Sequence, residues 1–197
     1  MASLFVRLAT VVVLVASVTA CGSGPVAPVV SFDPAGACTA NGQQPGAYPD
    51  LEAVLPRLYL GEPPTNLDSG RTCTSAALGT LAGHGISDLK FAGATWETGG
   101  SSGFTTAVFQ ADGLDATTMI EFYEAGAGAA RRTDRLQVSD VTVADQPGKR
   151  LDVLGTDGTG QTVVAWPAPE PGRVHVLLVA DLGDAKVTEL LGLFGTR

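Results

Sequence analysis

Hydrophobic and polar residues alternate along much of the chain, and this alternation predicts β-strands. Two alternating runs, residues 89–98 and 103–111, flank a turn of glycine and serine and are typical of a β-hairpin. Residues 137–181 predict four more strands, separated by the turns DQPGK, TDGTG and PAPEPG. The pattern therefore predicts an antiparallel sheet of about six strands.

Helical periodicity replaces the alternation in four segments. The predicted helices cover residues 48–58, 74–84, 115–130 and 184–194. The motif Ala-Asp-x-x-Asp-Ala begins at Ala111 and again at Ala180, each time between an apolar strand and a helix. Its second aspartate, Asp115 or Asp184, has the position of a helix N-cap. We therefore predict an α+β fold with helices packed on one face of the sheet, in which a strand–turn–strand–helix unit occurs twice through duplication or convergence.

Length and charge limit the function further. The chain has 197 residues, enough for one domain with a hydrophobic core, which we place at residues 45–197. Its formal net charge is −8, and basic residues do not cluster beyond the pair Arg131 and Arg132. An acidic protein without a basic patch is unsuited to bind a phosphate backbone, so we expect no nucleic-acid partner.

Residues 1–20 have the pattern of a signal peptide. Residues 8–20 are almost wholly apolar, yet this run is too short to cross a bilayer comfortably. Val18, Ala20 and Cys21 occupy the places of a bacterial lipobox, with Val18 in place of the usual leucine. Cleavage before Cys21 leaves either a free N-terminal thiol on a secreted protein or a cysteine that carries a diacylglycerol. We favour the lipid, which would anchor the protein on the outer face of the bacterial cytoplasmic membrane.

The other two cysteines predict a disulfide. Residues 21–44 are rich in glycine, proline and serine, and we expect them to form a flexible tether. If Cys21 carries the lipid, Cys38 and Cys73 remain, and outside the cytoplasm two remaining thiols usually pair. The alternative, a metal site, lacks a histidine or aspartate at ligand spacing, so we predict neither a metal nor another cofactor.

Few residues offer catalytic chemistry. His84, Ser87 and Asp88 lie close together in the sequence and are the first candidates for an envelope hydrolase with catalytic residues from distant segments. The simpler interpretation of His84 is a histidine at the end of a helix. His175 alternates with apolar residues, which predicts a place on the solvent face of a strand. No motif joins a nucleophile to a base, so we assign no catalytic residue.

Trp96 and Trp166 have matching positions in the two strand–turn–strand–helix units. The simpler interpretation is that each closes the core at the end of a strand. The functional alternative is that both line a shared ligand face.

Several segments, among them PGAYPDLEAVLP, LDSGRTC, LGTLAGHGI and FAGATW, resemble a group of uncharacterised exported bacterial proteins that are often lipid-anchored. The resemblance runs from about residue 38 to the end of the chain. It implies one extracytoplasmic α+β domain and no particular activity. Our leading hypothesis is a non-enzymatic binding or interaction module, held at the membrane through Cys21, with a small molecule or another envelope protein as partner. An envelope hydrolase is the alternative.

Overall fold

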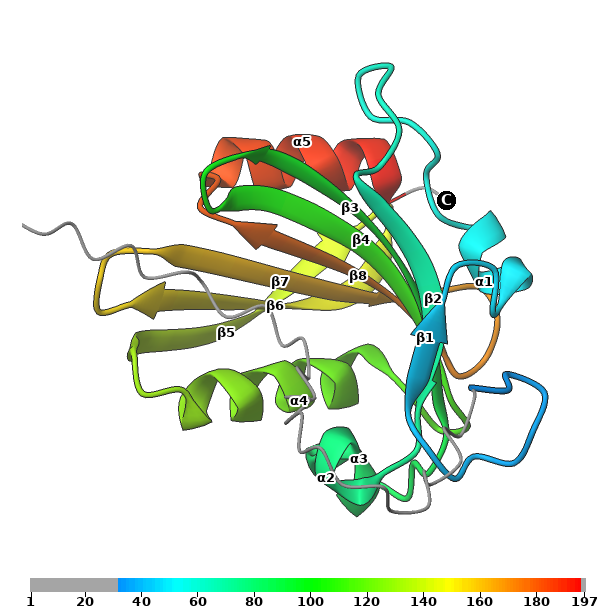
Figure 1. The fold of residues 1–197 in the computed structure, drawn as a ribbon. Helices are drawn as coiled ribbons and strands as arrows, with labels where there is room; N and C mark the ends of the chain where they lie inside the picture. The colour runs from blue at the N-terminus through cyan, green and yellow to red at the C-terminus, as the bar shows by residue number, and fades with distance from the viewer. Residues whose placement is uncertain (1–31, 196–197) are drawn as a thin grey trace, which may run out of the picture. The chain divides into compact units, whose positions relative to one another are not determined.

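Residues 32–195 form one open antiparallel sheet of eight strands (Figure 1). The computed structural model describes residues 32–195. The strands are β1 (Gly42–Gln44), β2 (Asn66–Thr72), β3 (Leu89–Gly99), β4 (Ser102–Gln110), β5 (Thr133–Val143), β6 (Gln146–Gly155), β7 (Gly160–Pro167) and β8 (Arg173–Ala180). The helices are α1 (Pro49–Ala53), α2 (Ser75–Leu78), α3 (Thr80–Gly83), α4 (Ala116–Ala129) and α5 (Asp184–Phe194). The sheet order β1-β2-β3-β4-β8-β7-β6-β5 places β4 and β8 side by side at its centre. The predicted α+β class and antiparallel sheet are confirmed.

The sheet has eight strands rather than about six because β1 and β2 were not predicted. β2 contains a single hydrophobic residue, Leu67, so it shows no apolar alternation. Two of its polar residues nevertheless face the interior: Ser69 is fully buried and Arg71 is only 5% exposed. The Ser69 hydroxyl accepts a hydrogen bond from the Tyr48 amide at 2.8 Å and donates one to Glu52 at 2.8 Å. Because the Ser69 hydroxyl is paired inside the protein, its burial costs little.

Helices cover both faces of the sheet, so the prediction that they pack on one face is wrong. Successive residues of a strand point to opposite faces. On β8, Val176 packs in a core with Met119 of α4, whereas the next residue, Leu177, packs in a second core with Leu190 of α5. α4 lies against β5, β6 and β7. The central strands are therefore buried from both sides.

The two predicted repeat units differ where the chain leaves the sheet. Asp115 is the N-cap of α4, as predicted, and its carboxylate accepts a hydrogen bond from the Thr118 amide at 2.7 Å. The N-cap of α5 is Gly183 rather than Asp184, whose carboxylate instead pairs with Arg150. The connection before α5 is two residues shorter than the one before α4. The two helices pack on opposite faces of the sheet.

The helix predicted over residues 74–84 is divided into α2 and α3. Gly79 lies between them with a φ of 52°. A right-handed helix cannot continue through a residue with positive φ, and glycine adopts this conformation at little cost. Leu78 of α2 and Leu81 of α3 pack in the same core as Met119 of α4.

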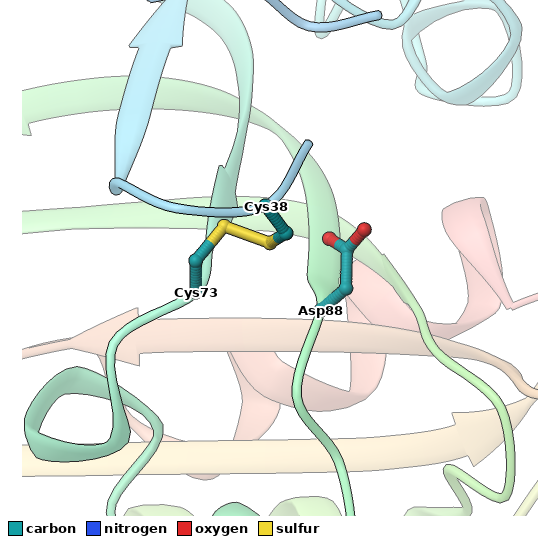
Figure 2. A group of neighbouring side chains, drawn as sticks. All are labelled: Cys38, Cys73 and Asp88. Atoms are coloured by element: carbon teal, nitrogen blue, oxygen red, sulfur yellow. A yellow bond between two sulfur atoms is a disulfide. The ribbon is translucent and has the colours of Figure 1, made fainter. Parts of the chain in front are cut away.

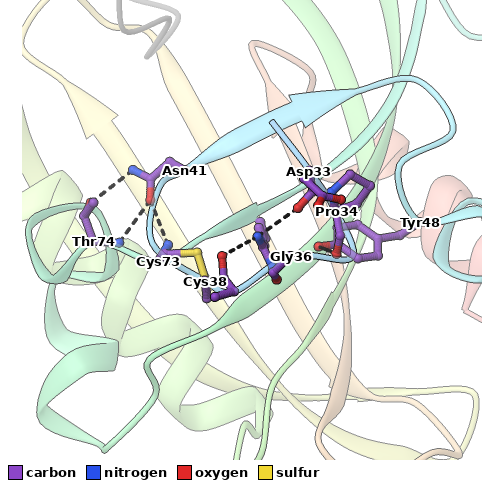
Figure 3. The surroundings of a disulfide bond; sticks show 10 residues. Asp33, Pro34, Gly36, Cys38, Asn41, Tyr48, Cys73 and Thr74 are labelled. Atoms are coloured by element: carbon purple, nitrogen blue, oxygen red, sulfur yellow. Dashed lines mark hydrogen bonds between the residues drawn. A yellow bond between two sulfur atoms is a disulfide. The ribbon is translucent and has the colours of Figure 1, made fainter. Parts of the chain in front are cut away.

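Residues 32–44 belong to the folded domain, so the predicted tether boundary at residue 44 is too far along the chain (Figure 3). β1 pairs with β2, and Cys38 is joined to Cys73. The guanidinium of Arg71 donates hydrogen bonds of 2.7–2.9 Å to three carbonyl oxygens of this segment, those of Asp33, Gly36 and Ala37. The rest of the predicted tether, residues 21–31, lies outside the described residues.

Candidate functional site

A cleft of about 570 Å³ lies between the start of α4 and the hairpin of β5 and β6. The register of the hairpin sets its floor: Thr142 lies opposite Pro147, and Asp140 lies opposite Lys149. Lys149 shares a face of β6 with Leu151, two residues on, which packs in the same core as α4. The cleft therefore opens on the α4 side of the sheet.

The hairpin turn explains why these residues reach the cleft. The turn consists of Ala144 and Asp145, with φ values of 47° and 63°, and Val143 pairs directly with Gln146. Positive φ at both central residues is the requirement of a type I′ turn, which matches the twist of the two strands. The predicted turn, DQPGK, was wrong because β6 already begins at Gln146. The side chains after that point consequently belong to a strand and line the cleft.

The start of α4 forms the opposite wall. Asp115, Ala116 and Thr117 line the cleft there. The Asp115 carboxylate uses one oxygen to cap the helix, through the Thr118 amide. The other carboxylate oxygen and the exposed Thr117 side chain contribute polar groups to the wall. Pro167, at the end of β7, adds an apolar surface.

The charges of the cleft sum to one negative charge. Lys149 donates a hydrogen bond of 2.6 Å to Asp140, whose side chain is 85% exposed. Asp115 has no cation among its contacts in the described residues. An opening with two carboxylates, one ammonium group, hydroxyl groups and proline rings suits a partly apolar ligand that carries a positive charge.

The two predicted tryptophans are buried on the other face of the sheet from the cleft, although Trp166 directly precedes Pro167 of the cleft lining. Trp96 is 4% exposed and stacks on Phe104 at 5.1 Å, and Trp166 is 3% exposed and stacks on His175 at 5.5 Å. Both side chains belong to the core on the α5 side. Across the sheet, the residue of β7 that lies in line with Trp96 is Thr162. Thr162 is four residues, or about 13 Å, from Trp166 along the strand. A ligand face shared by the tryptophans stays a prediction.

His175 is buried at 8% exposure, so its predicted place on the solvent face is wrong. Its ring faces Trp166 within the core on the α5 side, because both faces of β8 are covered. Burial lowers the pKa of His175, since the charged imidazolium is poorly solvated there; the nearby Glu170 opposes this effect. The neutral ring therefore serves as a core residue.

The candidate hydrolase residues have separate contacts. His84, at the end of α3, lies 3.0 Å from the Glu121 carboxylate of α4, and both side chains are 46% exposed. The side chain of Asp88 lies instead beside the disulfide, as Figure 2 shows. No hydrogen bond joins His84, Ser87 and Asp88 within residues 32–195. The hydrolase stays a prediction without an observed nucleophile–base pair.

The predicted disulfide between Cys38 and Cys73 is confirmed (Figures 2 and 3). The side-chain oxygen of Asn41 accepts hydrogen bonds from the amides of Cys73 and Thr74, and these bonds fix the chain around Cys73. The ligand atoms of the two cysteines and Asp88 lie within 4.8 Å of one another. Because the two sulfur atoms are bonded to each other, they are not thiolates that could hold a metal.

The disulfide is typical of an oxidising, extracytoplasmic location. The predicted signal peptide and Cys21 lie outside the described residues. Within residues 32–195, the structure has no helix long and apolar enough to cross a membrane.

The sequence analysis did not identify the residues of the cleft. They come from α4, β5, β6 and β7 and from four separate parts of the sequence. No local motif joins them, and the only available signal was the strand alternation that places Asp140 and Thr142 on one face. Comparisons with known proteins add no assignment, because no protein-family model, no curated protein and no solved structure matches the chain.

Proposed function

We propose that the protein is a lipid-anchored, extracytoplasmic binding module without enzymatic activity, and that the cleft at the start of α4 holds its ligand. The signal-peptide pattern and Cys21 support the anchor. The disulfide supports the extracytoplasmic location. The observation that carries the binding role is the open cleft itself, lined by Asp115, Asp140 and Lys149.

The remaining surface offers less for a ligand. α4 and α5 cover opposite faces of the sheet centre, and the aromatic side chains there are packed against one another. The cleft combines exposed charges with apolar proline rings, which is the usual composition of a small binding site. The lining contains no histidine, serine or cysteine, so it offers no serine–histidine or cysteine–histidine pair, and this supports binding rather than catalysis.

Mass spectrometry of the protein extracted from its own membrane in detergent tests the cleft. The variant Thr117→Trp would fill the cleft. The variant Glu124→Trp adds the same side chain to an exposed site seven residues along α4, on the same helix face, and is the matched control. We expect a bound mass in the wild type and the control, and its loss in Thr117→Trp. A mass retained by Thr117→Trp would place the ligand elsewhere, and no bound mass in the wild type would contradict a co-purifying ligand.

The intact mass of the same sample tests the anchor. A diacylglyceryl mass on Cys21, absent from a Cys21→Ser variant, is the expected result. An unmodified Cys21 in the mature wild-type protein would show that the protein is secreted without a lipid anchor, while leaving the binding role of the cleft to be judged by the first experiment.

A further inference from the structure

The two edges of the sheet differ in how they are protected. β1, at one edge, has three residues and adjoins the segment fixed by the disulfide. β5, at the other edge, has eleven residues and pairs only with β6 within the described part of the chain. A long edge strand presents a row of free backbone amide and carbonyl groups, which another strand can join.

β5 lacks several of the features that prevent such pairing, although it carries the charged residues Asp134, Arg135 and Asp140. Its sequence, TDRLQVSDVTV, contains neither proline nor lysine. Its irregular pairing is confined to the start of the strand, between Thr133 and Arg135, and the pairing is regular from Leu136 to Val143. Val138, in the middle of this regular part, is an exposed large hydrophobic residue with 42% of its surface accessible. The edge is therefore open to a further strand.

This open edge borders the cleft. Val138, Asp140 and Thr142 are alternate residues of β5 and share the face toward α4, and the last two line the cleft. A strand added beside β5 would place every second side chain next to these three residues. One polypeptide could thus use backbone hydrogen bonds for affinity and the cleft for side-chain selection.

The charge of the site indicates which side chain would enter. Asp115 and Asp140 outnumber Lys149 in the cleft, and the whole chain has a net charge of −8. Both the local and the overall field attract a cation. An arginine or lysine side chain fits this charge, and its methylene groups can pack on Pro147 and Pro167.

We propose that β5 binds an extended segment of another polypeptide by strand addition, with a basic side chain of that segment placed in the cleft. The proposal rests on the proposed binding role of the cleft and names the class of ligand.

The test begins with a displayed library of random nine-residue peptides, selected on the mature full-length protein. The enriched peptides are synthesised, and their affinities are measured by fluorescence anisotropy. We expect peptides with a central arginine or lysine. Asp140→Asn should weaken binding about tenfold, whereas Lys149→Ala should strengthen it, because the two changes shift the charge of the cleft in opposite directions. Lys186→Ala, on α5, is the control and should leave the affinity unchanged.

Two N-methylated forms of one selected peptide distinguish strand addition from binding of the side chain alone. Only alternate residues of an added strand donate backbone hydrogen bonds to the edge. Methylation of one alternate set should therefore abolish binding, and methylation of the other should leave it intact. Amide hydrogen exchange of Leu136–Val143 should also slow when the unmodified peptide binds.

Three results would overturn the proposal: no enriched peptide, equal effects of the two methylated forms, or outward β5 amides that are already protected in the free protein. The last result would show that another part of the chain covers the edge. If the bound mass of the native protein still depends on Thr117 while the peptides fail, the proposed function stands and the strand-addition proposal is rejected.

Discussion

Removal of the Cys38–Cys73 disulfide should lower the free energy of unfolding by about 4 kcal/mol. The two cysteines are 35 residues apart in the sequence. In the chain-entropy description, closing a loop of this length restricts the unfolded chain by that amount. A domain of this size has a total stability of roughly 5–15 kcal/mol, so the loss is a large fraction of it.

Other contacts on the segment before Cys38 persist in the disulfide-free protein. Arg71 still donates to three carbonyl groups, and β1 still pairs with β2. The native fold should therefore remain when both cysteines are replaced by serine. The free energy of unfolding should fall because the unfolded state gains conformational freedom and exposes more surface.

Urea denaturation of the wild type and the Cys38→Ser/Cys73→Ser double variant measures this effect. We expect a lower midpoint and a slightly larger dependence on urea in the variant. The wild type under reducing conditions should match it. A variant that changes the unfolding free energy by less than about 1 kcal/mol would refute the chain-entropy reasoning. Hydrogen exchange would then show whether residues 32–44 open separately from the rest of the domain.

Three further changes have defined outcomes. Gly172→Ala should lower the melting temperature and cost more than about 1 kcal/mol, because φ is 72° there and a Cβ would overlap the Ala111 carbonyl oxygen. Ala144→Asn should raise the unfolding free energy by about 1 kcal/mol in urea denaturation, because asparagine tolerates the positive φ of this turn. Burial lowers the pKa of His175, so below about pH 6.5 the unfolded chain binds a proton that the folded protein does not, and stability falls. His175→Gln should therefore lose less stability than the wild type between about pH 7 and pH 5, in denaturation curves at each pH.

The alternation of residues predicted the strands β3 to β8 because each has apolar side chains at regular intervals. β2 was missed because its interior positions are polar. Ser69 and Arg71 are buried through hydrogen bonds to the chain around residues 33–52, and sequence periodicity contains no information on those distant partners.

His175 shows a different reason for error. The run RVHVLLVA is apolar at consecutive positions as well as alternate ones. Such a run is typical of a strand covered on both faces, which leaves no solvent face for His175. The prediction of a single helical layer excluded this interpretation. The cleft could not be predicted for a related reason, because its position depends on which face α4 covers.

The fold leaves few places where a partner could bind. α4 and α5 bury both faces of the central strands, so a ligand cannot reach the middle of the sheet without displacing a helix. The β1 edge is short and adjoins the disulfide-linked segment. The exposed polar groups of the cleft and the free edge of β5 remain, and they adjoin each other through Asp140 and Thr142. A partner that used both would gain directional hydrogen bonds along the strand and a charged contact in the cleft, which together determine its orientation as well as its affinity.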